Sequence, residues 1–320
     1  MDSDLRSVTA TALVYALPMR TRFRGITVRT GVLLRGPAGW GEFSPFLDYG
    51  DAECVPWLAS AVEAATDGWP APVRDRIPVN CTVPVVAPDV AHRLVSASGC
   101  RTAKVKVADP GITVAADCDR VAAVRDALGS AGRIRVDANG AWDTEGAVAA
   151  IRELERAAGG LEYVEQPCQS VTELAEVRRR VDVRIAADES IRRAEDPLRV
   201  ALAGAADVAV IKVAPLGGVR RALAVAEACG LPCVVSSAVE TSVGLAAGLA
   251  LAGALPELDF ACGLGTVSLL TSDVVARPLF PVDGWLPVPV TPPEPVAAVA
   301  DAATTARWLD RLARVAALLG

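Results

Sequence analysis

The sequence predicts an α/β fold: a (β/α)8-type barrel with an N-terminal α+β domain that caps it. Eight short apolar runs, each followed by a polar turn and an Ala/Arg-rich amphipathic segment, occupy residues 78–83, 102–107, 134–138, 162–166, 184–188, 208–213, 233–237 and 260–265. Near-continuous apolar strands that alternate with helices are typical of a parallel sheet. Eight such units favour a closed barrel. An open doubly wound sheet is the alternative, but no G-x-G-x-x-G follows the first strand, which weakens a dinucleotide-binding interpretation.

The segments on either side of the barrel have a different pattern. Residues 1–76 contain short β-type runs at 8–15, 27–34 and 40–43, then helical periodicity over 52–66, and are predicted to form the capping domain. The barrel is expected to span residues 77–280. A Pro-rich connection at 281–295 leads to a predicted helix over 297–319. We expect this C-terminal segment, 281–320, to return to the capping domain.

Composition excludes several classes of protein. The chain has 320 residues, of which 52% are hydrophobic, so it folds around a large core. A net charge of −6 without a basic run argues against nucleic acid and anionic membranes as partners. The longest uncharged apolar stretch, 241–256, is shorter than the ~20 residues of a membrane span and predicts a buried helix. The first residues lack the features of a secretory signal, so we expect a cytoplasmic protein, for which a monomer is one allowed state.

Histidine and cysteine are poorly placed for catalysis or zinc binding. His92 is the one histidine, so no site can have two histidine ligands. The eight cysteines include no C-x-x-C pair and are predicted to be buried thiols. The chemistry is therefore expected to depend on other side chains.

Carboxylates end three consecutive predicted strands: Asp137, Glu165 and Asp188. The active site of such a barrel lies where its strands end, so these groups converge, and their mutual repulsion would be costly without a cation. Oxygen ligands of this kind suit Mg²⁺, with Mn²⁺ as the alternative. A single carboxylate at a strand end is usually a cap or an ion-pair partner. Three in succession favour a metal site.

Lysines flank this cluster. Lys104 and Lys106 are two residues apart and point to the same side of their strand, whereas Lys212 ends the strand across the barrel. A lysine near a metal in a partly dry pocket can act as a base, whereas arginine cannot release its proton. Only three of the 32 cationic residues are lysines, and all three are at this site. The pattern indicates removal of a proton next to a carboxylate, although Lys104 alone could simply pair with an acid.

Six motifs together resemble the enolase superfamily, in particular its muconate-lactonizing subgroup. They are K-V-K (104–106), V-D-A-N-G-A-W (136–142), V-E-Q-P (164–167), A-D-E-S (187–190), I-K-V-A-P-L-G-G (211–218) and S-S-A-V-E-T-S (236–242). G-W-G-E-F-S-P-F (39–46) supports the resemblance, which covers essentially the whole chain. It implies an enolase-like modified barrel, and a lysine base with a metal-stabilised enediolate, the chemistry generally assigned to this superfamily.

Within the subgroup, the likeness is to the actinobacterial dehydratases of menaquinone biosynthesis. This implies syn elimination of water from a small carboxylate, 2-succinyl-6-hydroxy-2,4-cyclohexadiene-1-carboxylate. Lys106 would remove the proton and return it to the departing hydroxyl, and Lys212 would stabilise the enediolate as a cation. The implied metal ligands are Asp137, Glu165 and Asp188, and the implied substrate-binding residues are Lys104, Asn139, Ser236 and Gly263. Segments 18–24 and 43–49 would close over the site.

Other activities compete with this interpretation. The racemases of N-succinylamino acids have the same lysines and metal ligands, so the barrel motifs do not separate the two reactions; C-G-L-G-T (262–266) and short N-terminal loops favour the dehydratases. A dipeptide epimerase is disfavoured, because the eighth strand lacks the Asp-x-Asp pair of those enzymes. A non-catalytic barrel is disfavoured by the intact lysines and carboxylates.

Overall fold

The N-terminal part of the chain forms a three-stranded antiparallel sheet together with the first two helices. The computed structural model describes residues 2–192, 199–296 and 300–319. The sheet has the order β1 (Leu13–Phe23), β2 (Ile26–Gly36), β3 (Gly39–Phe43), between α1 (Asp2–Thr9) and α2 (Asp51–Thr66). A Cβ at Gly41 would lie 1.9 Å from the carbonyl oxygen of Ala61, so glycine allows β3 to lie directly against α2. The sequence predicted this α+β unit with a strand over 8–15, which is correct for residues 13–15 of β1 but wrong for residues 8–12, where α1 ends in a turn.

The second unit contains seven parallel strands among the described residues, ordered as they occur in the chain. They are β5 (Cys81–Val83), β6 (Thr102–Lys106), β7 (Arg133–Asp137), β8 (Tyr163–Glu165), β9 (Ile185–Ala187), β10 (Val208–Ile211) and β11 (Cys233–Val235). Six of them fall within a predicted run and β7 begins one residue before its own, so the α/β barrel prediction is confirmed for these strands.

The eighth predicted strand, residues 260–265, is an irregular segment instead. Isolated parallel bridges join it to both edges of the sheet, Val79 to Cys262 and Ser236 to Gly263, so it closes the barrel. Its two glycines, Gly263 and Gly265, disfavour a regular strand. At Gly263 a Cβ would lie 2.5 Å from Ser236 Oγ, so the close approach that completes the barrel requires glycine.

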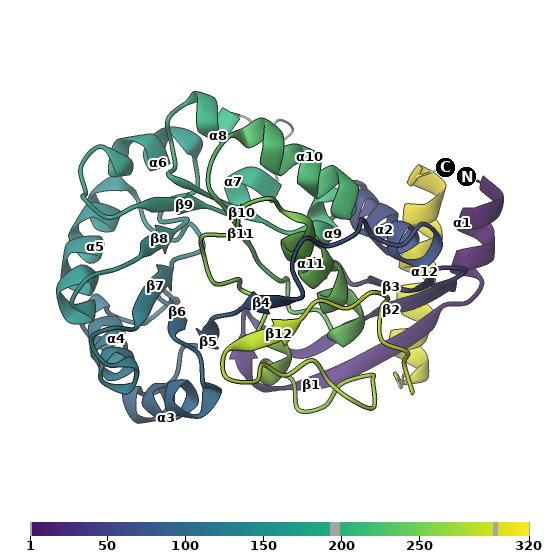
Figure 1. Ribbon diagram of the computed structural model, residues 1–320, viewed down its shortest axis with the longest axis horizontal. Coiled ribbons are helices and arrows are strands. Elements are labelled where there is room, and N and C mark those ends of the chain that lie inside the picture. The colour runs from purple at the N-terminus through teal and green to yellow at the C-terminus, as the bar shows by residue number, and fades with distance from the viewer. Residues whose placement is uncertain (1, 193–198, 297–299, 320) are drawn as a thin grey trace.

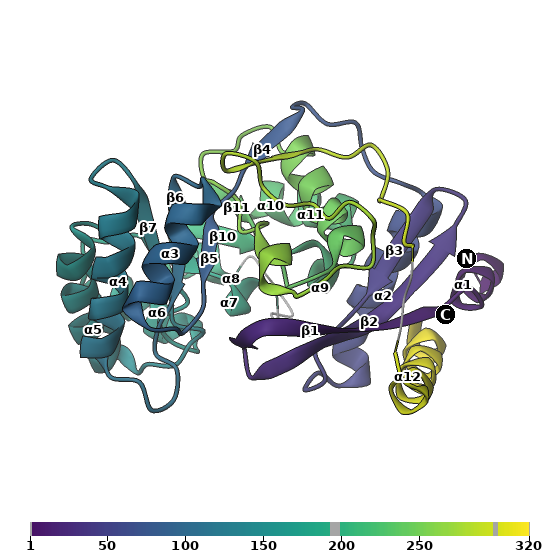
Figure 2. The same ribbon diagram turned by 90° about the horizontal axis from the view of Figure 1, so that it is seen from below.

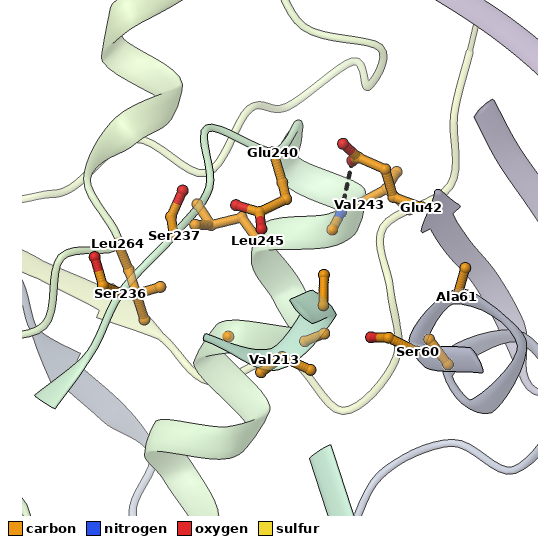
Figure 3. A pocket seen from close by; sticks show the side chains of 15 residues that line it. Glu42, Ser60, Ala61, Val213, Ser236, Ser237, Glu240, Val243, Leu245 and Leu264 are labelled. Atoms are coloured by element: carbon orange, nitrogen blue, oxygen red, sulfur yellow. Dashed lines mark hydrogen bonds between the residues drawn. The ribbon is translucent and has the colours of Figure 1, made fainter. Parts of the chain in front are cut away.

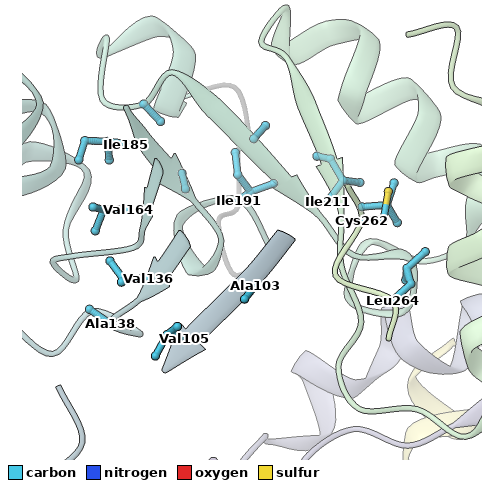
Figure 4. Packing of buried hydrophobic residues seen from close by; sticks show 14 of the residues in the cluster. Ala103, Val105, Val136, Ala138, Val164, Ile185, Ile191, Ile211, Cys262 and Leu264 are labelled. Atoms are coloured by element: carbon cyan, nitrogen blue, oxygen red, sulfur yellow. The ribbon is translucent and has the colours of Figure 1, made fainter. Parts of the chain in front are cut away.

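Helices cover the outside of the barrel (Figure 1). They are α3 (Pro88–Ser98), α4 (Val114–Leu128), α5 (Thr144–Ala158), α6 (Val171–Arg178), α7 (Glu189–Arg192), α8 (Arg199–Leu202), α9 (Val213–Leu216), α10 (Val219–Cys229) and α11 (Ser242–Ala254), followed by a 3-10 turn at Thr266–Leu269. Residues facing these helices alternate along the strands with residues facing the barrel axis. Val105, Val136, Val164, Ile185 and Ile211 belong to the strand–helix core (Figure 4).

The C-terminal part of the chain returns to the three-stranded sheet. β12 (Trp285–Pro287) pairs antiparallel with β4 (Arg76–Pro78), and α12 (Ala302–Leu319) packs against α2. α1 and α12 lie at the same end of the molecule (Figure 1), and the β1–β2 hairpin reaches from there toward the barrel (Figure 2). The predicted helix over 297–319 is α12, although residues 297–299 lie outside the described part of the chain. The exact domain limits at 76 and 280 stay a prediction.

Predictions about buried segments agree with the structure. α11, within the apolar stretch 241–256, is buried along almost its whole length. Across the described ranges, no helix combines the length and apolarity required to cross a membrane. Five of the eight cysteines are buried as predicted, whereas Cys81, Cys118 and Cys233 are half-buried, and none of the eight is in a disulfide.

Trp308 on α12 tests how strongly this helix stabilises the capping unit. Its side chain is 1% exposed and packs edge-on against Phe43, with ring centroids 5.9 Å apart. Trp308→Ala is expected to lower the free energy of unfolding by about 3–5 kcal/mol, because it leaves a cavity. The matched control is Leu309→Ala, at a neighbouring position that is 42% exposed, with an expected change within about 0.5 kcal/mol. Urea unfolding followed by circular dichroism measures both, and equal effects would contradict this role of α12.

Candidate active site

Strand register brings the predicted catalytic residues to one level of the barrel. Lys106 lies opposite Asp137, and Asp137 lies opposite Glu165, on three neighbouring strands. Asp188 directly follows β9, and Lys212 directly follows β10. Because side chains alternate in direction along a strand, these residues share the face that points into the barrel with Lys104 and Ser236.

Each of the three carboxylates is paired with a lysine. Lys104 Nζ lies 2.8 Å from both oxygens of Glu165 and 3.1 Å from Asp137 Oδ2. Lys106 Nζ lies 2.5 Å from Asp137 Oδ2, and Lys212 Nζ lies 2.5 Å from Asp188 Oδ2. The carboxylates are at most 1% exposed, so these charges interact in a medium of low dielectric.

Burial and charge shift the pKa values of this cluster in different directions. Burial lowers the pKa of Lys106 below the usual lysine value, although the charge of Asp137 opposes it. Burial acts to raise the pKa of Asp137, but Lys104 and Lys106 outweigh it and hold that pKa well below its usual range. Burial, together with the charge of Asp137, raises the pKa of Glu165. Lys106 is thus the lysine whose proton the surroundings make easier to remove.

Two amide side chains support the cluster. Asn139 Oδ1 accepts a hydrogen bond from Lys106 Nζ at 2.7 Å, and the Asn139 backbone N–H donates to Asp137 Oδ1 at 3.1 Å. The fully buried Gln166 accepts from the backbone N–H groups of Asp188 and Ser190, at 2.9 and 3.2 Å. Gln166 thereby fixes the backbone that carries Asp188. Sequence reasoning missed its role, although it stands in the V-E-Q-P motif.

A pocket opens over the cluster. It is lined by seven of the predicted site residues, Lys104, Lys106, Asp137, Asn139, Lys212, Ser236 and Gly263. Glu165 and Asp188 are buried next to it and bonded to Lys104 and Lys212. A few polar groups that converge on one pocket are typical of small-molecule sites.

The capping unit supplies an aromatic wall of this cavity. Phe23, Arg24, Phe46 and Trp57 line it, and Lys106 Nζ lies 5.3 Å from the centroid of the Phe23 ring. Arg24 lies over the Phe46 ring, 3.9 Å from its centroid. The segments 18–24 and 43–49 were predicted to lie at the site, and both contribute residues to it. Residues 18–23 belong to β1, however, and are not a loop.

Other lining residues were not predicted. Thr82 and Thr266 come from the first and last segments of the barrel. A polar residue at the end of the first barrel strand was the available signal for Thr82. His92 lies 3.2 Å from Asp126 and is partly exposed on α3, which agrees with its interpretation as a surface residue.

The donor set fits a hard divalent cation. Within the described residues, no three His, Cys, Asp or Glu side chains are grouped closely enough to hold an ion as they stand. Yet the Lys104 ammonium already lies within 3.1 Å of both Asp137 and Glu165, so this point accommodates a positive charge between two carboxylates. Carboxylates without nitrogen or sulfur ligands suit Mg²⁺ or Mn²⁺ better than zinc.

Fold and site together define a capped barrel enzyme that pairs lysines with strand-end carboxylates. The family model described as enolase C-terminal domain-like matches residues 87–292, and that described as enolase N-terminal domain-like matches residues 14–65. The o-succinylbenzoate synthase of Thermobifida fusca is 68% identical over 278 residues, covering 87% of each chain. That of Mycobacterium tuberculosis H37Rv is 55% identical over 310 residues, covering 96% of this chain and 94% of the relative. The chain belongs to the enolase superfamily and, within it, to the o-succinylbenzoate synthases.

Solved structures support the same fold. The L-Ala-D/L-Glu epimerase of Bacillus subtilis aligns with a TM-score of 0.75 at 26% identity, covering 90% of this chain and 98% of the epimerase. The muconate lactonizing enzyme of Pseudomonas putida aligns with a TM-score of 0.73 at 23% identity, covering 95% and 98%. A dipeptide epimerase of Enterococcus faecalis, solved with Mg and a dipeptide, aligns with a TM-score of 0.73 at 23% identity, covering 88% and 97%. The chain is thus a lyase of the enolase superfamily.

Proposed function

We propose that this chain converts 2-succinyl-6-hydroxy-2,4-cyclohexadiene-1-carboxylate to o-succinylbenzoate and water, a step of menaquinone biosynthesis, with Mg²⁺ bound by Asp137, Glu165 and Asp188. Mn²⁺ is the alternative ion. The observation that carries the proposal is that Lys106 and Lys212, paired with different carboxylates, line the same cavity. The o-succinylbenzoate synthases that match most of the chain support this reaction over racemisation.

Charge balance favours an anionic substrate. With Lys106 neutral, as a base must be, two lysine cations and three carboxylates leave one negative charge, so a divalent ion gives the site one positive charge. The proposed substrate carries one carboxylate on the ring and one at the end of the succinyl arm. The ring carboxylate balances the charge of the site, which reduces the cost of burying it.

Lys106 is proposed to act as base and then as acid. Its neutral amine takes the proton from ring carbon 1, and the electrons of that C–H bond move into the adjacent carboxylate, giving an enediolate. The Lys106 ammonium then gives a proton to the hydroxyl at carbon 6, the C–O bond breaks, and water leaves as the ring becomes aromatic. A bound Mg²⁺ supplies positive charge at the carboxylate oxygens, where negative charge develops.

The remaining residues are proposed to bind and orient the substrate. Lys212 stays protonated on the opposite side of the ring and stabilises the enediolate, and Lys104 neutralises a substrate carboxylate. Asn139 holds Lys106 at 2.7 Å and so orients the base. Ser236 and Gly263, joined by a backbone bridge, are proposed to contact the succinyl arm. Phe23 and Phe46 exclude water from the cavity.

A side-by-side assay tests the proposed reaction. The enzyme with Mg²⁺ is given the cyclohexadiene substrate in one cell and N-succinyl-phenylglycine in another, with ring aromatisation followed by absorbance and racemisation by polarimetry. Fast dehydration with little racemisation is expected. Racemisation that is as efficient as dehydration would reject a dedicated dehydratase, and racemisation alone would reject the proposal.

We further propose that the enzyme works in the cytoplasm, without nucleic acid or membrane partners.

A further inference from the structure

One loop at the barrel mouth has a backbone conformation that its sequence disfavours. This loop, residues 236–241 between β11 and α11, is called the β11–α11 loop below. Its residue Val239 has a φ of +64° and is 3% exposed. Positive φ in a β-branched residue is a true outlier, which persists only where the surroundings impose it.

Hydrogen bonds within the loop account for part of this conformation. The Ala238 N–H donates to Glu240 Oε2 at 2.7 Å, and the Val239 N–H donates to Ser237 Oγ at 2.8 Å. Ser237 Oγ in turn lies 2.6 Å from Thr266 Oγ1, directly after the segment that closes the barrel. These bonds join the loop to itself and to the barrel, so they do not fix its position relative to the capping unit.

The capping unit holds the loop through two buried, charged side chains. Arg29 on β2 donates to the carbonyl of Val239 at 2.9 Å and to that of Ala238 at 3.2 Å. Glu42 on β3 accepts from the N–H of Thr241 at 3.1 Å and from that of Gly244 at 3.0 Å, the bond drawn in Figure 3. Arg29 is 2% exposed and also bonds the Ser44 carbonyl, so its fork joins β3 to the strained residue.

The same loop forms a wall of the proposed substrate cavity. Ser236, Ser237, Ala238 and Val239 all line it, beside Lys212. In Figure 3, Ser236 and Ser237 lie on one side of a neighbouring pocket, and Glu42 and Ser60 lie on the other. The position of this wall therefore depends on an arginine that does not itself line the cavity.

We propose that Arg29 is a positioning residue for substrate binding: it holds Val239 in its strained conformation and so keeps the β11–α11 loop where it contacts the succinyl arm. This role rests on the proposed function, because the wall matters only if the cavity binds that substrate. A preformed wall contacts the succinyl arm equally well in the bound substrate and in the transition state. It therefore lowers KM and leaves kcat nearly unchanged. Arg29 acts through the loop and not on the reacting atoms.

Arg29→Lys tests the role while keeping the charge beside Glu42. Lysine lacks the planar fork that reaches two carbonyls and β3 at once. KM for the cyclohexadiene substrate is expected to rise about tenfold, the effect of one lost charge-assisted hydrogen bond, while kcat changes less than about threefold. The matched control is Arg74→Lys, since Arg74 also bonds backbone carbonyls, those of Ala252, Leu255 and Pro256, but away from the cavity. Its KM is expected to equal that of the unaltered enzyme.

Adding Val239→Gly to Arg29→Lys is expected to restore substrate affinity. Such a recovery is not expected if Arg29→Lys acts only by lowering the overall stability of the protein. Glycine adopts positive φ without strain, so the loop needs less support from Arg29. The double variant R29K/V239G is expected to recover most of the lost affinity, whereas R29K/V239A, which keeps a Cβ, is not. A KM unchanged in R29K, or a fall in kcat alone, would overturn the proposal, as would equal rescue by Ala and Gly.

Amide hydrogen exchange separates this inference from the proposed reaction, because it needs no turnover. In R29K the N–H groups of Val239 and Thr241 are expected to exchange about tenfold faster than in the unaltered enzyme, while those of β6 and β7 do not change. Val239→Gly in that background is expected to restore slow exchange at Thr241. Faster exchange in an enzyme that fails to dehydrate the substrate would reject the proposed reaction but support the positioning role of Arg29. Unchanged exchange in an active enzyme would reject the positioning role of Arg29 alone.

Discussion

Lys106→Arg is expected to lower kcat for dehydration by about 10³-fold or more, although it keeps a positive charge next to Asp137. Arginine cannot give up its proton in a protein, so it cannot serve as the base. The ion pair at 2.5 Å between Lys106 and Asp137 can be replaced by a guanidinium pair, which leaves the carboxylate neutralised. Stopped-flow and steady-state assays of ring aromatisation measure the change.

Lys212→Arg is the matched variant, because the two lysines have different proposed roles. Lys212 is required only as a cation, so arginine there is expected to cost about tenfold in kcat and to leave measurable turnover. If both lysines were bases, as in a racemase, both substitutions would abolish activity alike. Equal losses would therefore contradict the roles assigned here, and full activity in Lys106→Arg would exclude Lys106 as the base.

Asp188→Asn is expected to weaken Mg²⁺ binding at least about 100-fold, since replacing a ligand costs no less than removing one of its supporting groups. The asparagine side chain has the same shape and can still accept from Lys212, so the fold should change little. Isothermal titration of the metal-free protein measures the affinity. Activity of the unaltered enzyme is expected to disappear in a chelator and to return with added Mg²⁺.

Glu162→Gln serves as the control for that experiment. Glu162 is also a buried carboxylate of the barrel, but it precedes β8 and pairs with Arg135 at 2.5 Å, at the end away from the cavity. Its substitution is expected to reduce stability but to leave the Mg²⁺ affinity unchanged. Retained activity of Asp188→Asn in the chelator, or equal loss of affinity in both variants, would contradict the metal assignment.

Much of the barrel and the site could be predicted from the sequence, because both depend on strand periodicity. Seven of the eight predicted strands were confirmed, since each is a short apolar run with its own turn. The convergence of Asp137 and Glu165 follows from parallel register, which places the ends of neighbouring strands at one level. The superfamily and the class of enzyme, predicted from the motifs, are confirmed by the comparisons. The residue-by-residue roles stay predictions.

Features that depend on contacts between distant segments could not be predicted. The irregular segment 260–265 looks like a strand because its apolar content is high, but it contains two glycines, which disfavour regular strand structure, and it is joined to its neighbours by isolated bridges alone. Residues 8–12 were wrongly included in the first predicted strand because periodicity does not separate a short helix end from a strand start. The bonds of Arg29 to the β11–α11 loop join residues about 210 positions apart, for which the sequence carries no local signal.

The return of α12 to the capping unit has a consequence for biosynthesis. Arg311 on α12 donates to the carbonyls of Phe46 and Tyr49, in the segment that supplies an aromatic wall of the cavity. A ribosome makes that segment early and α12 only after the whole barrel, and domains tend to fold as they emerge. The aromatic wall therefore lacks its anchor on α12 until that helix has been made, so the order of synthesis places completion of the wall after that of the barrel strands.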